Sequence, residues 1–206
     1  MADIADHPER DWTVLLIGGA SGTGKTRLSY PLARRFGVPI VEVDDIVEAL
    51  QAMTTPEQQP ALHHWATHLE AARLPPEDIL RIHLAVADSL APALAAVVAN
   101  HLETDTPVII EGDYLTPAFA ARQAFREERA DGRVASLFLQ EPDVDQLVAN
   151  FSGRESGGEQ RGRARVSALY SEWLAAEAAR SGVLMMPSRP WSSLQRRVLA
   201  VIGRRV

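Results

Sequence analysis

A glycine-rich segment with one lysine and one threonine has the residue types and spacing that binding of phosphate groups requires. It reads Gly19-Ala20-Ser21-Gly22-Thr23-Gly24-Lys25-Thr26 and fits the pattern G-x-x-x-x-G-K-[ST] at every fixed position. Glycines let backbone N–H groups approach a polyphosphate, and a helix that begins there adds its partial positive charge. Lys25 adds a mobile full charge for the β- and γ-phosphates, and the Thr26 hydroxyl can bind Mg²⁺. This segment, Gly19–Thr26, is the phosphate loop, and it predicts a site for a nucleoside triphosphate.

The elements around this segment alternate between strands and helices. Apolar runs predict five strands, at Thr13–Ile17, Val38–Val43, Pro107–Glu111, Arg133–Leu139 and Val183–Met186. Helices are predicted between and after them, over 27–36, 46–52, 56–72, 76–100, 117–129, 142–151, 163–180 and 191–202. This alternation predicts a three-layer, doubly wound α/β fold with a five-stranded parallel sheet. Ligands of such sheets bind at the carboxyl ends of the strands.

Length and composition are typical of a globular protein. With 206 residues and 46% hydrophobic residues, we expect a single domain over 1–206 that includes a helical insertion over 52–104. The net charge of −6 argues against a nucleic-acid partner. The apolar stretch 84–102 contains Asp88 and Pro92, so no membrane partner is expected. The absence of cysteine and an acidic, polar N-terminus are typical of a cytoplasmic protein. The oligomeric state is not readable from the sequence.

Asp44 is the candidate catalytic base. It follows the second predicted strand, where its carboxylate could orient an acceptor hydroxyl and take its proton. Aspartate is also a favoured N-cap, and a helix is predicted from about Ile46. Asp45 is closer to that helix and fits the capping role better than Asp44 does. The choice between Asp44 and Asp45 as the base stays open at this point.

Glu111 is the candidate carboxylate for the metal shell, together with Thr26. It ends the third predicted strand after the apolar residues Val108-Ile109-Ile110, at the edge where ligands are expected. A glutamate there would act on Mg²⁺ through a coordinated water, since Mg²⁺ keeps several waters in proteins. The alternative is a charge at the end of a strand that faces the solvent.

Residues 152–165 form a polar, glycine-rich segment with four arginines and two glutamates. The planar guanidinium group of arginine binds phosphate oxygens in pairs, so such a segment could close over a transferring phosphoryl group. Arg154 and Arg161 are the first candidates for this role. The alternative is a solvated charged loop, which most runs of this kind are.

Arg189 follows the last predicted strand, between Ser188 and Pro190. Its guanidinium could stack on the base of a nucleotide, while backbone groups read the edge of the base. A simple turn that ends at Pro190 explains the same residues equally well.

Taken together, these segments resemble the P-loop small-molecule kinases, the group related to adenylate, shikimate and chloramphenicol kinases, and 2-phosphoglycerate kinase-like proteins above all. The resemblance runs from about Val14 to Val201 and rests on the segments 18–26, 43–50 and 109–117, on Trp65, and on the arginine-bearing loop before Tyr170 and Trp173. It implies ATP and Mg²⁺ as cofactors, residues 152–165 as a lid, residues 52–104 as the acceptor side and residues 183–191 as the place of the adenine. It also implies transfer of the γ-phosphoryl group to a small hydroxylated or acidic acceptor. A Val-Asp pair in the chloramphenicol kinases matches Val43-Asp44, which implies Asp44 as the base.

Two alternative functions remain. A polynucleotide 5′-end kinase would use the same chemistry, although the acidic composition disfavours it. A nucleotide-binding regulatory ATPase without an acceptor would need the phosphate loop and no base beside it. The acceptor itself is not revealed by the sequence, nor is the lid arginine that matters most.

Overall fold

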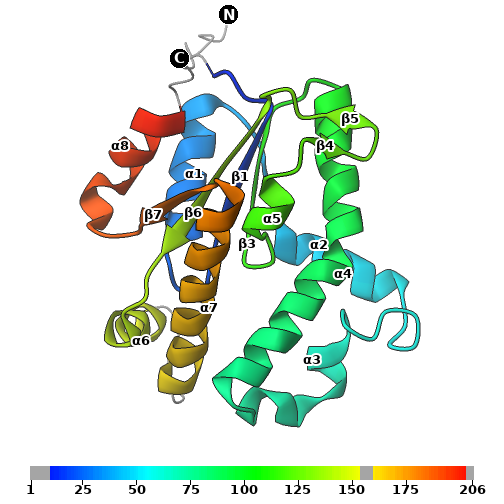
Figure 1. Ribbon diagram of the computed structural model, residues 1–206, viewed down its shortest axis with the longest axis vertical. Helices are drawn as coiled ribbons and strands as arrows, with labels where there is room; N and C mark the ends of the chain where they lie inside the picture. Colours follow the sequence, from blue (N-terminus) through cyan, green and yellow to red (C-terminus); the bar gives the residue numbers. More distant parts are fainter. Residues whose placement is uncertain (1–9, 154–159, 203–206) are drawn as a thin grey trace, which may run out of the picture.

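Five parallel strands form the central sheet in the order β2-β3-β1-β6-β7, so that β1 lies in the middle (Figure 1). The computed structural model describes residues 10–153 and 160–202. The strands are β1 (Val14–Gly19), β2 (Ile40–Glu42), β3 (Val108–Gly112), β6 (Val134–Gln140) and β7 (Leu184–Pro187). Gly18 of β1 is in register with Gly112 of β3 and Phe138 of β6. The carboxyl ends of these three strands therefore meet at the same edge, beside the phosphate loop.

Helices cover both faces of the sheet, which gives the three layers that the sequence predicts (Figure 1). Side chains of β1 alternate between the faces: Leu15 packs in one cluster with residues of α1 and α8, and Leu16 packs in the other with residues of α4 and α7. The helices are α1 (Lys25–Phe36), α2 (Val43–Met53), α3 (His64–Thr67), the 3₁₀ helix η1 (Leu69–Arg73), α4 (Pro76–Glu103), α5 (Pro117–Ala120), α6 (Val144–Ser152), α7 (Gln160–Ser181) and α8 (Trp191–Ile202).

The predicted helix over 117–129 is wrong. Only α5 forms there, and a hairpin of β4 (Ala124–Phe125) and β5 (Glu128–Arg129) follows it. Phe125 is fully buried and its ring centroid lies 5.3 Å from that of Phe119, while Arg126 has a φ of 54° at the turn. Burial of Phe125 in the core therefore overrides the helical preference of the surrounding alanine and charged residues.

Two further boundaries differ from the prediction. The stretch 56–72 contains turns, α3 and part of η1 instead of one helix, since Pro60 would interrupt a continuous helix there. The second strand ends at Glu42, and Val43 already belongs to α2. Val43 is fully buried, and a Cβ at Gly112 would lie 2.5 Å from its Cβ. Asp44 therefore lies in the first turn of a helix, not at the end of a strand.

Helix α4 is long and apolar enough to cross a membrane by length and composition alone, with a mean hydropathy of 1.8 over its most apolar window. In this fold the helix packs on the sheet. Leu90, Leu94 and Val98 are buried in the same core cluster as Leu16 of β1 and Leu174 of α7. Its apolar character therefore has a structural explanation within the fold.

Gly18 leaves no room for a side chain, because a Cβ there would lie 2.1 Å from Cε1 of Phe138. We expect Gly18→Ala to lower the free energy of unfolding by about 2–3 kcal/mol, since Phe138 is fully buried and cannot move aside cheaply. The midpoint of thermal unfolding should then fall by roughly 5–10 °C. Gly162→Ala is the matched control, because no heavy atom lies within 4 Å of a Cβ at that helical position. Equal melting temperatures for Gly18→Ala and the wild type would contradict this packing.

Candidate active site

A cavity of about 610 Å³ lies at the carboxyl edge of the sheet. The phosphate loop contributes its wall from Ser21 to Arg27, and the ends of β2 and β3 contribute the opposite side. It brings together these predicted site residues: Ser21, Gly22, Gly24, Lys25, Thr26, Asp44 and Glu111. The structure therefore brings these residues to one cavity, and their binding and catalytic roles stay predictions.

The phosphate loop is held in shape from within and from α6. Gly22 and Gly24 have φ values of +80° and +90°, which residues with a Cβ rarely adopt. The Thr23 hydroxyl donates to the carbonyl oxygen of Ala20 at 2.8 Å. Asn150 Nδ2 donates to the carbonyl oxygen of Gly22 at 2.9 Å, which ties the loop to α6. The loop thus keeps the open backbone turn that phosphate binding needs.

Lys25 is buried and points to the end of β3. Its Nζ forms an ion pair with Asp113 Oδ1 and donates to the carbonyl oxygen of Ala20 at 3.2 Å. Asp113 is fixed in turn by Tyr170, whose hydroxyl donates to the Asp113 carbonyl oxygen at 2.7 Å. The only lysine in the sequence is therefore held in the cavity by a carboxylate that α7 positions.

Glu111 is only 5% exposed, so the alternative of a charge facing solvent is wrong. Thr26 Oγ1 donates to Glu111 Oε1 at 3.0 Å, while Oε2 is buried and has no hydrogen-bond partner among the described residues. Burial raises the pKa of Glu111, and Lys25 and the Thr26 hydroxyl oppose this rise. A buried carboxylate oxygen without a partner, beside a threonine hydroxyl, fits the shell of a phosphate-bound Mg²⁺.

Within 10–153 and 160–202, no group of three or more His, Asp or Glu side chains is arranged to hold a metal ion alone.

Asp44 lines the cavity, whereas Asp45 is not among the lining residues. Neither residue caps α2, because the N-cap is Glu42 and it makes no side-chain capping bond. Asp44 as a whole residue is exposed. Partial burial of its carboxyl group and the nearby Asp113 carboxylate nevertheless raise the pKa of Asp44, and the charge of Lys25 opposes this rise. Of the two aspartates, Asp44 is therefore the one that lines the cavity, and its role as a base stays a prediction.

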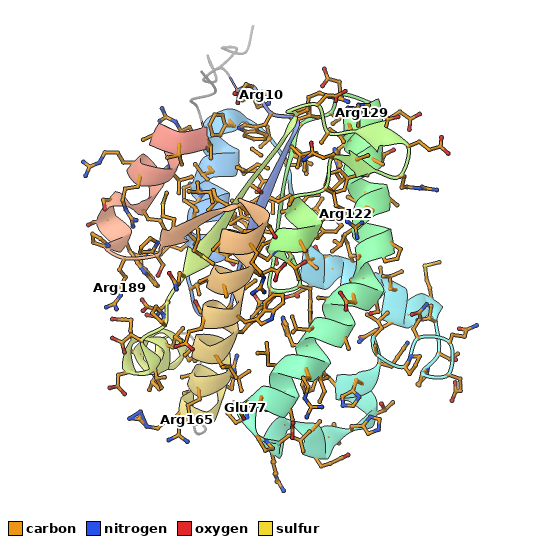
Figure 2. All side chains as sticks on the ribbon, in the orientation of Figure 1. Arg10, Glu77, Arg122, Arg129, Arg165 and Arg189 are labelled. Atoms are coloured by element: carbon orange, nitrogen blue, oxygen red, sulfur yellow. The ribbon has the colours of Figure 1, made fainter. Side chains whose placement is uncertain are left out.

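Arg189 lies at the end of β7, beside α6 (Figure 2). Its Nε donates to Glu141 Oε2 at 2.6 Å and its Nη1 donates to Gln146 Oε1 at 2.7 Å. It is not among the residues that line the cavity, so the structure does not bring Arg189 to the phosphate site. Gln146 in turn donates to Asn150, which donates to the carbonyl oxygen of Gly22. These hydrogen bonds link Arg189 to the phosphate loop indirectly, through two other side chains.

The predicted lid falls partly outside the described residues. Arg154 is one of the residues that the structure does not describe. Arg161 lies in the first turn of α7, where its Nη1 donates to Asp145 Oδ1 at 2.8 Å, and both side chains are exposed. The roles of Arg154 and Arg161 in a lid over 152–165 stay predictions.

Trp191 ends the segment 183–191, in which the sequence predicts Arg189 as the contact of the nucleotide base, and it lines the cavity with Ala149, Asn150 and Gly153. The Arg27 guanidinium lies 4.3 Å from the centroid of its ring. A Cβ at Gly24 would lie 3.5 Å from Trp191 Cζ2, so the indole packs against the phosphate loop. Its Nε1 is buried without a hydrogen-bond partner among the described residues. Only the tertiary fold brings Trp191 to the loop, although the start of α8 at this residue was predicted.

Curated relatives support the resemblance that the motifs indicate. The chain is 26% identical over 150 residues to a 2-phosphoglycerate kinase of Methanothermobacter thermautotrophicus, which covers 68% of this chain and 47% of that protein. It is 29% identical over 111 residues to a 2-phosphoglycerate kinase of Pyrococcus furiosus, covering 52% and 36%. The chain thus spans about half the length, or less, of these relatives. No protein-family model matches it.

Solved kinase structures share the fold. A sugar kinase from a Janibacter species aligns with a TM-score of 0.52 at 19% identity, over 92% of this chain and 93% of that one. A gluconokinase of Sinorhizobium meliloti gives a TM-score of 0.51 at 17% identity, over 94% and 92%. A shikimate kinase of Bacteroides thetaiotaomicron gives 0.50 at 18% identity, over 93% and 99%. The predicted α/β fold of the P-loop small-molecule kinases is therefore confirmed.

Proposed function

We propose that this chain is an ATP-dependent kinase that phosphorylates a small-molecule acceptor. One observation carries the proposal: a single cavity contains the phosphate loop with Lys25, the Thr26–Glu111 pair and the carboxylate of Asp44. The first two groups account for a bound nucleoside triphosphate. The third supplies a base, which a protein that only senses a nucleotide does not need.

Phosphoryl transfer then requires positioning and one proton transfer. The acceptor hydroxyl oxygen attacks the γ-phosphorus, the bond to the β–γ bridging oxygen breaks, and ADP leaves. Asp44 orients the hydroxyl and takes its proton. Lys25 stabilises the negative charge that develops on the phosphates, and Asp113 directs the lysine toward them.

The residues beside the phosphate loop suit an Mg²⁺–ATP substrate. Mg²⁺, when bound, neutralises charge on the phosphate oxygens. Thr26 would hold it directly and Glu111 would hold it through a water, as the unpartnered Oε2 of this carboxylate supports. The acceptor, the cytoplasmic location and the oligomeric state stay outside this proposal.

Trp191, in place of the predicted Arg189, would hold the nucleotide base. Its ring is next to the phosphate loop, and stacking of a base on an aromatic side chain stabilises a complex by about 1–3 kcal/mol. We expect Trp191→Leu to raise the Kd for ATP about tenfold or more, measured by calorimetry. Arg189→Gln, which alters an arginine outside the cavity, should change this Kd far less. The reverse order of effects would restore Arg189 as the base-binding residue.

Activity should depend on pH through Asp44. Because the pKa of Asp44 is raised, its carboxylate is protonated at a higher pH than an ordinary aspartate, whose pKa is about 3.9. The base form is then lost sooner as the pH falls, so the acidic limb of the kcat/KM profile should lie above that value. Asp113→Asn removes a carboxylate that raises this pKa and should move the limb to lower pH, whatever its effect on the rate. Asp45→Asn should move the acidic limb less, since Asp45 has the smallest effect on the pKa of Asp44 among the neighbouring charged groups.

An ADP-release screen tests the proposal. Purified protein with Mg²⁺ and ATP is given a panel of hydroxylated acids, sugars and phosphorylated acids, and ADP is followed by a coupled assay. We expect at least one acceptor class to raise ADP release well above the rate with water alone. A rate that no acceptor class raises would contradict the proposed kinase activity.

A further inference from the structure

A second cavity, of about 670 Å³, lies between α4 and α7. It shares Ser21 and Asp113 with the first cavity, so the two spaces meet at the residues that surround Lys25. Its other walls come from Trp65 of α3, from η1 and the first turns of α4, and from α7. A molecule bound here would reach the phosphate end of the nucleotide site, which is where a phosphoryl acceptor must lie.

Trp65, His83 and Tyr170 form the aromatic wall of this cavity. His83 stacks on Tyr114 with ring centroids 4.4 Å apart, and Tyr170 lies 4.5 Å from His83. The polar groups of two of these rings already have partners within the protein. The Tyr170 hydroxyl donates to the Asp113 carbonyl oxygen at 2.7 Å, and His83 Nε2 lies 3.3 Å from the same oxygen. Burial lowers the pKa of His83, so its ring is neutral at physiological pH.

Aliphatic side chains extend this apolar wall outward. Leu74 lines the cavity just before α4, Pro76 and Ile79 line it from the start of α4, and Val166 lines it from α7. A compact, highly charged molecule would leave these apolar side chains without partners. The free-energy cost of removing water from its charges would then be offset by few contacts with the wall. An apolar body of the size of an aryl ring would bury them.

The rim of the cavity is positively charged. Arg73, Arg163 and Arg165 line it, and all three are exposed. Arg165 lies at the same end of the molecule as Glu77 at the start of α4 (Figure 2). Among the residues that the structure describes, Asp113 is the only acidic side chain that lines the cavity, and Lys25 already forms an ion pair with it. The rim therefore complements a negative charge on the ligand.

We propose that this second cavity binds the acceptor, and that the acceptor is a hydroxylated acid with an apolar, aryl-sized body and one anionic group. The inference rests on the proposed kinase function for the role of the ligand as acceptor. The aromatic wall holds the body, the arginine rim holds the anion, and the hydroxyl reaches toward Asp44. A compact phosphorylated acid without an apolar body matches the rim and leaves the wall unused.

Calorimetry with four probes tests the ligand class without any turnover: 3-phenyllactate, its amide, glycerate and 2-phosphoglycerate. We expect 3-phenyllactate to bind about tenfold tighter than glycerate, because only it buries a ring. It should also bind about tenfold tighter than its amide, which lacks the charge. Binding of glycerate or 2-phosphoglycerate as tightly as 3-phenyllactate would overturn the proposal, as would equal binding of the acid and the amide.

Variants locate the site. Ile79→Ser should weaken binding of 3-phenyllactate without affecting glycerate, and the double variant Arg73→Gln with Arg165→Gln should weaken both acids. Arg180→Gln, at the far end of α7 and paired with Glu177, is the control and should change neither. Melting temperatures verify that each variant folds. An unchanged Kd for 3-phenyllactate in folded Ile79→Ser and in the double arginine variant would overturn the site.

The two proposals fail in different ways. Tight binding of 3-phenyllactate without ATP-dependent phosphorylation of any acceptor would contradict the kinase function and leave the ligand class standing. Phosphorylation of another acceptor with no measurable binding of 3-phenyllactate would contradict the ligand class and leave the kinase function standing.

Discussion

Replacing Asp44 with asparagine is expected to lower kcat for acceptor phosphorylation by roughly 10²- to 10⁴-fold, the range that loss of a general base produces. Asparagine keeps the size of the side chain and cannot take the proton. The Kd for ATP should stay within about threefold of the wild type, because no phosphate-binding group is removed. Steady-state kinetics with the best acceptor and calorimetry with ATP measure the two quantities.

Asp45→Asn is the matched control for this experiment. It removes the neighbouring carboxylate on the same turn of α2, and Asp45 does not line the cavity. Its kcat should remain near that of the wild type. If Asp44→Asn kept full acceptor-dependent ADP release, the mechanism with Asp44 as base would be wrong.

Replacing Lys25 with methionine should lower kcat/KM by roughly 10²- to 10³-fold or more, since one preorganised charge on the transferring group is lost. Methionine fills the space of the lysine stem and leaves the Asp113 carboxylate without its ion pair. Nucleotide affinity should also fall. Lys25→Arg should restore little, because a planar guanidinium does not replace a compact ammonium in a site shaped for it.

Chemical modification of Lys25 is an independent measurement of its contact with the phosphates of the nucleotide. Lys25 is its only lysine, so an amine-acylating reagent can modify one side chain and otherwise only the N-terminal amine. Saturating Mg²⁺–ATP should slow acylation of Lys25, detected by peptide mass spectrometry, with the N-terminal amine as internal control. Equal acylation of Lys25 with and without Mg²⁺–ATP would contradict its role at the phosphates.

Local sequence patterns were sufficient for the sheet and for most of the residues that line the first cavity. The phosphate loop has its chemistry in consecutive residues, and the apolar runs before it and before Glu111 are strands buried on both faces. The closing helix α8 has the predicted bounds, Trp191–Ile202. Each of these features depends on residues close together along the chain.

Features that depend on distant residues were not predicted. Asp113 is 88 residues from Lys25, and no local signal shows that the two form an ion pair. Trp191 reaches the phosphate loop only because β7 lies next to β6 and brings α8 beside α1. The helix predicted over 117–129 is wrong for the same reason, since burial of Phe125 is a tertiary effect.

The most direct test of the account is where the γ-phosphoryl group of ATP goes. Phosphorus-31 NMR of a reaction with Mg²⁺, ATP and the acceptor that most raises ADP release distinguishes a phosphate ester from inorganic phosphate. The account predicts a new ester signal that grows in step with ADP and that is lost with Asp44→Asn. Inorganic phosphate as the sole product, formed at the same rate with and without acceptor, would contradict it and indicate an ATPase.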